Sequence, residues 1–386
     1  MTTAPRPLVH HTPVSGWVND PLGLTFHDGR YHLFFQYVPD STTWDVACHW
    51  GHATSDDLLT WTPEPPALSP GDGEDGVWSG NLVRTAAGDA VAFYTAVDAE
   101  NREIGRVRRA VPTNASWREW TKEEVVVRLP EDEPAVAFRD PFVYADGAGW
   151  RMLMGGGLPG GVPVVWMFTS ADLRSWTYAG RALEGGPGPS TIWECPVLVD
   201  IGGRQALVVS DCEPGAPLHV AYAWVEAVGD RFDAGPWRRL GYGSYYAAST
   251  FLDADGRPGL VHWVREVIDT DAGWAGVTSL PHLLERDGER LVARPHPALD
   301  GVSTLLDRRG SLGGSAVTDV EWQPAADDEL VPRAGLTLAV AADVLTVRSG
   351  ARVATMPWRG GPLRVVVDGP VLEVFGADGV LALPVD

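Results

Sequence analysis

Three segments of the chain carry an acidic side chain one or two residues before a proline. They are Asn19-Asp20-Pro21, Arg139-Asp140-Pro141 and Trp193-Glu194-Cys195-Pro196. Three carboxylates that meet at one point could bind a metal ion, or two of them could cleave a glycosidic bond as a pair. A calcium site would need several acids on one loop, and none of these segments offers that. The segments therefore favour glycosidic cleavage over metal binding.

The neighbours of the three acids suggest different roles. Arg139 precedes Asp140, and an adjacent cation is expected to keep that carboxyl ionised with a low pKa. Glu194 has apolar neighbours on both sides, a setting that favours the protonated form, as a general acid requires. Asn19 supplies an amide beside Asp20 that can bind a sugar hydroxyl. Each segment alone is weak evidence for a site, because an isolated Asp-Pro pair is usually a turn.

An internal repeat indicates how the acids are positioned. Thr54–Trp61 recurs as Thr169–Trp176, and Asn19-Asp20-Pro21 recurs as Arg139-Asp140-Pro141, both about 115–120 residues further on. Short apolar runs separated by turn residues, with 44 glycines and 31 prolines, indicate an all-β fold. Further unit starts near residues 80, 194 and 247 would give repeats of the length of a four-stranded propeller blade.

The repeat predicts a five-bladed β-propeller over residues 1–305. The innermost strand of each blade lines the central channel, so acids at the starts of units one, three and four would meet there. The recurring Ser-x-Asp-Leu-x-x-Trp is interpreted as structural. Asp57 and Asp172 are expected to build turns, and Trp61 and Trp176 to fill gaps between blades.

The rest of the chain changes pattern. Short alternating strands towards the C-terminus predict a small β-sandwich over residues 315–386. Residues 114–129 and 219–228 are interpreted as candidate short helices, without enough helical pattern elsewhere for a helical layer.

The composition limits the partners. With 51 acidic and 30 basic residues the formal net charge is −21, so we expect no nucleic acid and no membrane partner, and a neutral small-molecule substrate instead. Three scattered cysteines predict neither a disulfide framework nor a zinc site. The N-terminal residues show no signal-peptide pattern, which predicts a cytoplasmic location. The sequence leaves a homo-oligomer open.

The ordered set of motifs resembles glycoside hydrolase family 32, the invertase, inulinase and levanase family. The resemblance spans nearly the whole chain. The motifs that carry it are Trp17-Val18-Asn19-Asp20-Pro21, Phe34-Phe35-Gln36-Tyr37, His49-Trp50-Gly51-His52-Ala53, Trp78-Ser79-Gly80, Phe138-Arg139-Asp140-Pro141, Trp193-Glu194-Cys195-Pro196, Tyr246-Ala247 and Gly273-Trp274-Ala275-Gly276.

This resemblance implies an exo-acting β-fructofuranosidase with net retention, hydrolysing sucrose or short fructo-oligosaccharides without a metal or organic cofactor. By position, Asp20 corresponds to the nucleophile, Asp140 to the stabiliser of the transition state and Glu194 to the acid/base. The positions that correspond to a fructose-binding pocket are Trp17, Asn19, Gln36, Trp44, Trp78, Ser79, Arg139 and Trp263.

Some residues depart from the family pattern and leave the substrate range open. Leu22 replaces an asparagine that usually follows the Asn-Asp-Pro motif, Ser249 replaces a glutamine, and His282 stands in a segment that usually reads Pro-Arg-Glu. Rival interpretations are a fructosyltransferase, whose acceptor side Leu22 and Ser249 would influence, a non-catalytic sugar-binding propeller, and a related five-bladed family acting on arabinofuranosides. The Trp-x-Asn-Asp-Pro and Trp-Glu-Cys-Pro contexts favour fructose.

Overall fold

The computed structural model describes residues 5–186, 190–212, 218–302 and 317–386, and β-strands dominate these ranges. The predicted all-β class is confirmed. Two short 3₁₀ helices, η1 (Ala99–Asn101) and η2 (Pro297–Gly301), lie between strands. Across these ranges, no helix is long and apolar enough to cross a membrane.

Consecutive strands pair with one another in antiparallel groups. The first eight strands are β1 (Gly16–His27), β2 (Arg30–Val38), β3 (His49–Ser55), β4 (Thr62–Leu68), β5 (Gly76–Arg84), β6 (Ala90–Val97), β7 (Arg106–Pro112) and β8 (Trp120–Val127). The next four are β9 (Ala137–Asp146), β10 (Gly149–Leu158), β11 (Val162–Ser170) and β12 (Thr177–Glu184). Within each set of four, each strand pairs with the next.

Two further groups follow, with minor changes in pairing order. One contains β13 (Ile192–Asp200), β14 (Gln205–Cys212), β15 (His219–Val228), β16 (Arg231–Ala234) and β17 (Arg238–Gly243). The other contains β18 (Tyr245–Leu252), β19 (Pro258–Asp269), β20 (Trp274–Thr278), β21 (His282–Asp287) and β22 (Arg290–Pro295). The helices considered for 114–129 and 219–228 are wrong, because β8 and β15 occupy these segments. Their edge-to-edge pairing with β7 and β14 outweighs the weak local helical pattern.

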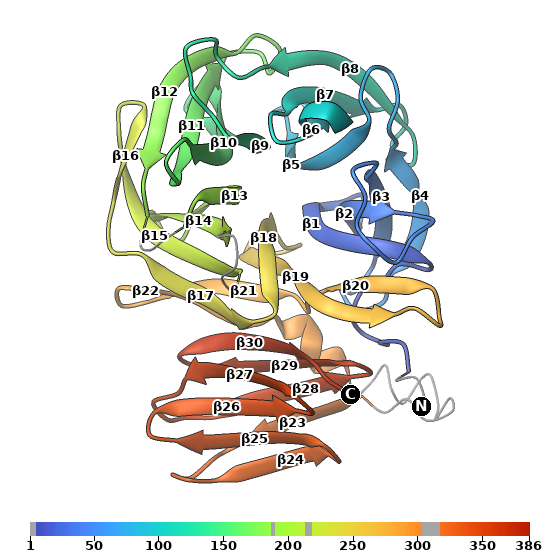
Figure 1. The fold of residues 1–386 in the computed structure, drawn as a ribbon, viewed down its shortest axis with the longest axis vertical. Coiled ribbons are helices and arrows are strands. Elements are labelled where there is room, and N and C mark those ends of the chain that lie inside the picture. The colour runs from blue at the N-terminus through green and yellow to red at the C-terminus, as the bar shows by residue number, and fades with distance from the viewer. Residues whose placement is uncertain (1–4, 187–189, 213–217, 303–316) are drawn as a thin grey trace.

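The strand groups lie around a common centre, and β1, β5, β9, β13 and β18 lie nearest to it (Figure 1). Each of these strands contacts the next one around the centre, and β18 contacts β1. Every unit start inferred from the repeat lies in one of them. No sheet of the described residues closes on itself through hydrogen bonds. Backbone pairing joins the last group to the first, through β20 and β1, and the third group to the fourth, through β10 and β13. Contacts between the innermost strands join the other neighbouring groups.

The repeated Ser-x-Asp-Leu-x-x-Trp motif builds the same turn twice. Asp57 Oδ1 accepts a hydrogen bond from the Leu59 backbone N–H at 2.9 Å, and Asp172 Oδ1 accepts one from the Arg174 N–H at 2.8 Å. The Trp176 ring then contacts Phe93 of a different strand group, with ring centroids 5.8 Å apart. The structural interpretation of this motif is confirmed.

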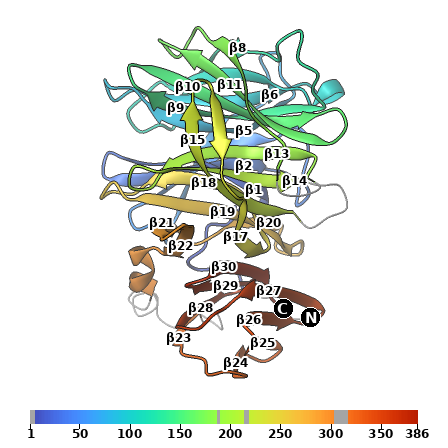
Figure 2. The ribbon, with the colours of Figure 1, turned by 90° about the vertical axis from the view of Figure 1, so that its left-hand side faces the viewer.

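The C-terminal residues form two sheets that share one apolar core. Their strands are β23 (Thr318–Trp322), β24 (Glu329–Arg333), β25 (Leu336–Ala341), β26 (Val344–Ser349), β27 (Arg352–Pro357), β28 (Leu363–Asp368), β29 (Val371–Gly376) and β30 (Gly379–Pro384). Strands β24–β27 form one sheet, and β23, β28, β29 and β30 lie in the other. Figure 2 shows this part below the strand groups that surround the centre. The boundary predicted between residues 305 and 315 falls within 303–316, outside the described residues.

A buried charge cluster joins the N-terminal segment, the C-terminal sheets and the central strands. Asp368 accepts hydrogen bonds from the backbone of Leu8, Val9 and His10 and from the His10 ring, at 2.8–3.1 Å. Glu373 lies 3.6 Å from the other nitrogen of that ring and accepts a hydrogen bond from the Leu280 N–H at 3.1 Å. Burial alone would lower the pKa of His10, but the two carboxylates raise it to about 9.

We expect this cluster to make the stability of the protein depend on pH above neutrality. Because the pKa of His10 is raised from 6.5 to about 9, its contribution is fully present below pH 6.5 and is lost as the pH rises through 9. A His10→Gln variant should lose about 3 kcal/mol of stability at pH 6, since removing one partner leaves buried charges unpaired. Its melting temperature should also change less between pH 6 and 9.5 than that of the wild type. Thermal unfolding at the two pH values checks both points, and equal pH dependence in the two proteins would contradict the assignment.

Candidate active site

The innermost strands share a break in their pairing where the candidate site residues lie. The register shifts between Val18 and Pro21 in β1, between Trp78 and Gly80 in β5, between Glu194 and Val197 in β13 and between Tyr246 and Ser249 in β18. The pairing of β9 with β10 shifts opposite Asp140 as well. Such bulges re-aim side chains, here towards the common centre.

Proline fits these bulges because they leave a backbone position without a ladder hydrogen bond. This explains why three acids precede a proline in the sequence. The backbone at the bulges is also unusual, with φ of 62° at Asp140, 46° at Cys195 and 48° at Ala247. These left-handed conformations are strained for residues with a side chain and are typical of functional sites.

Asp20 lies in a cluster of amide and hydroxyl donors. Its Oδ1 accepts a hydrogen bond from Asn19 Nδ2 at 3.0 Å, and its Oδ2 accepts one from Gln36 Nε2 at 3.0 Å. The Ser79 hydroxyl also donates to Oδ2, and the Cys195 thiol lies 3.6 Å from it. Burial raises the pKa of Asp20, while the hydrogen bonds from Ser79 and Asn19 act in the opposite direction. These donors fix the orientation of the carboxylate.

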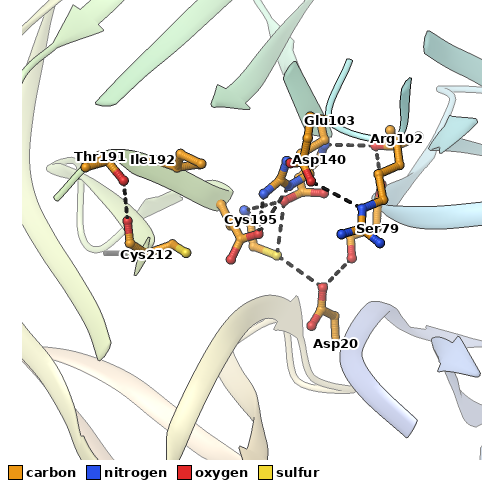
Figure 3. Close-up of polar contacts among 12 residues, drawn as sticks. Asp20, Ser79, Arg102, Glu103, Asp140, Thr191, Ile192, Cys195 and Cys212 are labelled. Atoms are coloured by element: carbon orange, nitrogen blue, oxygen red, sulfur yellow. Dashed lines mark hydrogen bonds and ion pairs between the residues drawn. The ribbon is translucent and has the colours of Figure 1, made fainter. Parts of the chain in front are cut away.

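Asp140 and Asp20 both contact Cys195. Its Oδ2 accepts a hydrogen bond from the Cys195 N–H at 2.9 Å, and its own N–H donates to Thr95 Oγ1 at 2.8 Å. Figure 3 shows Asp20, Ser79, Cys195 and Asp140 converging from different strands. The structure therefore brings the two aspartates to one place, as the repeat predicted.

Glu194 is held from two sides. Its Oε1 accepts hydrogen bonds from Arg139 Nε at 3.1 Å and Nη2 at 2.8 Å. Its Oε2 accepts a hydrogen bond from the Tyr246 hydroxyl. The third nitrogen of the same guanidinium, Nη1, donates to Glu103 Oε2 at 2.8 Å.

Two expectations about charge at the site are wrong. Arg139 forms its ion pairs with Glu194 and Glu103, and its attraction does not hold the pKa of Asp140 low. Burial raises the pKa of Asp140 to about 7, and the carboxylates of Glu194 and Asp20 add to this, against the attraction of Arg139. The surroundings of Glu194 are also polar rather than apolar, because alternation along β13 turns the Trp193 ring away to pack against Trp237.

The predicted tryptophans form two pairs. The rings of Trp17 and Trp263 have centroids 5.6 Å apart, and those of Trp44 and Trp78 lie 5.4 Å apart. Trp17 Nε1 donates to Asn19 Oδ1 at 3.1 Å, which connects the first pair to Asp20. Trp78 precedes Ser79 in β5, which connects the second pair to the same carboxylate. Trp44 is 38% exposed, so part of an indole at this site is open to solvent.

A cavity of about 590 Å³ runs along the centre, lined by all the innermost strands. Ser79, Asp140 and Cys195 border it, but none of the predicted tryptophans does. Along β1 and β5 the tryptophan comes first, then the site residue, and then the residues that line the cavity. The acids therefore separate a tryptophan-bearing end from the cavity. Leu22 and Ser249 line the cavity, so these departures lie away from the tryptophans.

His282, the third departure, lies outside the site. It is fully buried, and its Nε2 lies 3.8 Å from Glu373 in the cluster that joins the C-terminal sheets to the central strands. Its role there is structural.

Sequence reasoning missed two residues that contact the site. Tyr246 stands in the innermost strand β18, at the same phase of the repeat as the acids, so the repeat could have identified it. Glu103 lies in the loop between β6 and β7, where the sequence carries no signal for its contact with Arg139. Among the residues that the structure describes, no group of His, Cys, Asp and Glu side chains is arranged to hold a metal ion.

Comparisons with known proteins agree with this geometry. The family model for the N-terminal domain of glycosyl hydrolases family 32 matches residues 10–295. An insoluble β-fructofuranosidase isoenzyme of Arabidopsis thaliana is 31% identical over 379 residues, covering 86% of this chain and 59% of the plant protein. A sucrose-6-phosphate hydrolase of Escherichia coli is 31% identical over 312 residues, covering 75% of this chain and 64% of that protein. The chain thus spans less than two thirds of the length of these relatives.

Solved structures show the same fold. A GH32 β-fructofuranosidase from Bombyx mori superposes with a TM-score of 0.84 at 24% identity, covering 98% of this chain and 89% of that one. A point mutant of the same silkworm enzyme in complex with sucrose gives a TM-score of 0.80 at 25% identity, with the same two coverages, 98% and 89%.

We expect removal of the Asp140 charge to stabilise the protein at alkaline pH. The folded state raises the pKa of Asp140 from 3.8 to about 7, so it binds this proton more tightly than the unfolded chain does. The cost of the ionised carboxyl is therefore fully present above pH 7 and disappears as the pH falls towards 3.8. Asp140→Asn should raise the melting temperature by roughly 2 °C or more at pH 8, with a smaller gain at pH 4.5. Asp40→Asn, at an exposed carboxyl, is the control, and an unchanged or lower melting temperature for Asp140→Asn at pH 8 would contradict the expectation.

Proposed function

Because the chain belongs to family 32 of the glycosyl hydrolases, we propose that it hydrolyses β-fructofuranosides, with sucrose and short fructo-oligosaccharides as substrates. The observation that carries this proposal is the meeting of Asp20, Asp140 and Glu194 at the centre of the ring, each in a different hydrogen-bonding environment. Two carboxylates with unlike environments are what a double displacement at a sugar needs.

Asp20 is proposed as the nucleophile. The donors from Asn19, Gln36 and Ser79 hold its carboxylate in one orientation, which supports attack on the anomeric carbon of fructose. In the first step a bond forms from Asp20 to that carbon while the bond to the leaving oxygen breaks. Attack from the opposite face inverts the centre, and a second displacement by water restores it.

Glu194 is proposed as the acid/base. In the first step it gives a proton to the leaving oxygen, and in the second it takes a proton from the attacking water. Its side chain is 21% exposed, unlike the nearly buried aspartates, so it lies on the side where leaving group and water arrive. Arg139 and Tyr246 orient the carboxyl for both steps.

Asp140 is proposed to bind hydroxyls of the fructosyl ring. Burial raises the pKa of this carboxyl to about 7. Its ionised form is therefore poorly stabilised by its surroundings and gains from hydrogen bonds that sugar hydroxyls donate. The strength of such bonds can then grow as positive charge develops on the ring in the transition state. The indole faces of the two tryptophan pairs suit the apolar face of the sugar.

The strand arrangement supports a five-bladed β-propeller over residues 1–305 and a C-terminal β-sandwich over 315–386, which we propose as the domain organisation. Its support is the ring of contacts among β1, β5, β9, β13 and β18 and the shared core of the two C-terminal sheets. A cytoplasmic location and the absence of nucleic acid and membrane partners stay predictions, and homo-oligomer formation stays open.

A fructosyltransferase of the same family remains the second candidate. The two reactions share the fructosyl-enzyme and differ in whether water or a sugar hydroxyl resolves it. A non-catalytic sugar-binding propeller is disfavoured by the unlike environments of Asp20 and Glu194, which simple binding does not require.

We predict that Asp20→Asn and Glu194→Gln each lower kcat on sucrose by about a thousandfold or more while the fold stays intact, since each removes a group that takes part in bond making. Azide should restore turnover of Glu194→Ala on a fructoside with an activated leaving group, giving fructosyl azide, because neither departure of that group nor attack by azide needs the acid/base. Steady-state kinetics with circular dichroism as the folding control measure both effects. More than about a tenth of wild-type activity in Asp20→Asn would refute the assignment.

We predict net retention and release of terminal fructose. Carbon NMR of early products is the suitable method because the anomeric carbon of fructose carries no hydrogen. Sucrose should give β-fructofuranose first, and 1-kestose should give fructose and sucrose. α-Fructofuranose as the first product would indicate inversion, which requires the carboxyls at about 6.5–9.5 Å instead of about 5–5.5 Å. Longer oligomers as main products would favour transfer.

A further inference from the structure

One guanidinium at the site is shared between two carboxylates. Arg139 directs Nε and Nη2 to Glu194 and Nη1 to Glu103, with shortest distances of 2.8 Å on both sides. The Arg139 side chain is 9% exposed, whereas that of Glu103 is 46% exposed. Figure 3 shows Glu103 and Arg102 among the polar contacts of the site. The nearly buried cation therefore has a second carboxylate at the edge away from Glu194.

The main chain fixes where Glu103 lies. The Phe138 N–H donates to the Glu103 carbonyl at 2.8 Å, and the Gly105 N–H donates to the Phe138 carbonyl at 2.9 Å. Phe138 immediately precedes Arg139, so these bonds align the loop after η1 with the start of the Arg139 segment. Gly105 permits this approach, since a Cβ there would lie 2.2 Å from Thr95 Cγ2. A chance surface ion pair would not have such support from the backbone.

The side chain of Glu103 also has two neighbours of opposite charge. Its Oε1 lies 3.4 Å from Arg102 Nε, and the Arg102 guanidinium lies over the exposed Trp44 ring at 5.4 Å from its centroid. Glu103 therefore stands between the wall of the site that Trp44 forms and the cation that binds Glu194.

The charges that face Glu194 explain why a second carboxylate matters. Arg139 is the cation in contact with it, while Asp20 and Asp140 act on it through space. The remaining titratable neighbours are neutral at working pH, because burial raises the pKa of Tyr246 and Cys195 well above their ordinary values and that of Cys212 to about 11. A guanidinium paired with Glu194 alone would favour its ionised form, which cannot donate a proton.

We propose that Glu103 is a positioning residue for the acid/base: it holds the Arg139 guanidinium edge-on to Glu194 and shares its charge, so that Glu194 can carry the proton that the leaving oxygen needs. This inference rests on the proposed function. Glu103 does not touch the reacting atoms and acts through Arg139. Burial alone would lower the pKa of Arg139, but the carboxylates of Glu194, Asp140 and Glu103 raise it above its ordinary value, so the cation is permanent and its orientation is what can change.

The test compares three variants of the full chain. Glu103→Gln keeps an acceptor for Arg139 and removes the charge, Glu103→Asp keeps the charge on a shorter side chain, and Glu100→Gln removes a charge from the preceding turn, where Glu100 is exposed. The pH dependence of kcat/KM is measured on sucrose, which needs the acid, and on a fructoside with an activated leaving group, whose departure does not. Melting temperatures show whether each variant is folded.

We expect Glu103→Gln to lower kcat/KM on sucrose about tenfold at the wild-type pH optimum, a part of the 10²–10⁴-fold that a general acid contributes. The alkaline limb of its profile should move to lower pH, since the unshared guanidinium favours ionised Glu194. Activity on the activated fructoside should change less than threefold. Glu103→Asp should recover the position of the limb, and Glu100→Gln should behave as wild type.

Three results would overturn the inference. Glu103→Gln could match Glu100→Gln in rate and pH profile, which would make the ion pair purely structural. Its loss could be equal on both substrates, which would place the effect on fructose binding. If Glu103→Gln does not fold, the pH profile of kcat/KM for Glu103→Asp decides. Because this variant keeps the charge, an alkaline limb displaced from that of the wild type would count against the inference. A wild-type protein without activity on either substrate refutes the proposed function itself, whereas an active wild type with an unaffected Glu103→Gln refutes the inference alone.

Discussion

The burial of several carboxyl groups at one point is the constraint on which the site depends. Asp20 is 9% exposed and Asp140 is 4% exposed, and neighbouring negative charges in such a place repel each other and lose their hydration. The protein offsets this with fixed donors on Asp20, a backbone N–H on Asp140 and a guanidinium on Glu194. Three of these partners come from different strand groups: Ser79 from β5, Arg139 from β9 and Cys195 from β13. The relative placement of the strand groups therefore determines the protonation of the site as much as the acids themselves do.

No continuous sheet closes the ring that fixes this placement, and packing together with short stretches of backbone pairing between strand groups holds it together. Neighbouring innermost strands contact each other around the centre, and turn-borne tryptophans such as Trp176 reach into adjacent groups. The buried cluster around Asp368 and Glu373 joins the N-terminal segment and the C-terminal sheets to β21 and to Leu280, which precedes it. The C-terminal sheets thus support the ring from outside, although they contribute none of the contacts described at the site.

The sequence predicted which acids meet but not how their charges are arranged. The phase of the repeat was sufficient for Asp20, Asp140 and Glu194, because bulges at equivalent points of each innermost strand direct equivalent residues to the centre. The partner of Arg139 could not be predicted from its neighbour Asp140, since alternation along a strand sends adjacent side chains in different directions. The contact of Glu103 with Arg139 could not be predicted for a related reason. It depends on backbone hydrogen bonds between a hairpin loop and Phe138, and no local sequence pattern indicates these bonds. The short helices were misjudged where strand pairing outweighed local preference.

The bulges have a consequence for how such a site can diversify. Each bulge presents a side chain to the same small volume. Its geometry comes from the strand pairing, and in β1, β9, β13 and β18 a proline or a left-handed residue lies beside it. The residues at these bulges are two aspartates, a serine, and the glutamate and tyrosine that form a hydrogen bond with each other. A substitution of the residue at one bulge leaves the neighbouring strands in register. The scaffold can therefore acquire a new reaction or a new specificity through single substitutions while the fold is retained.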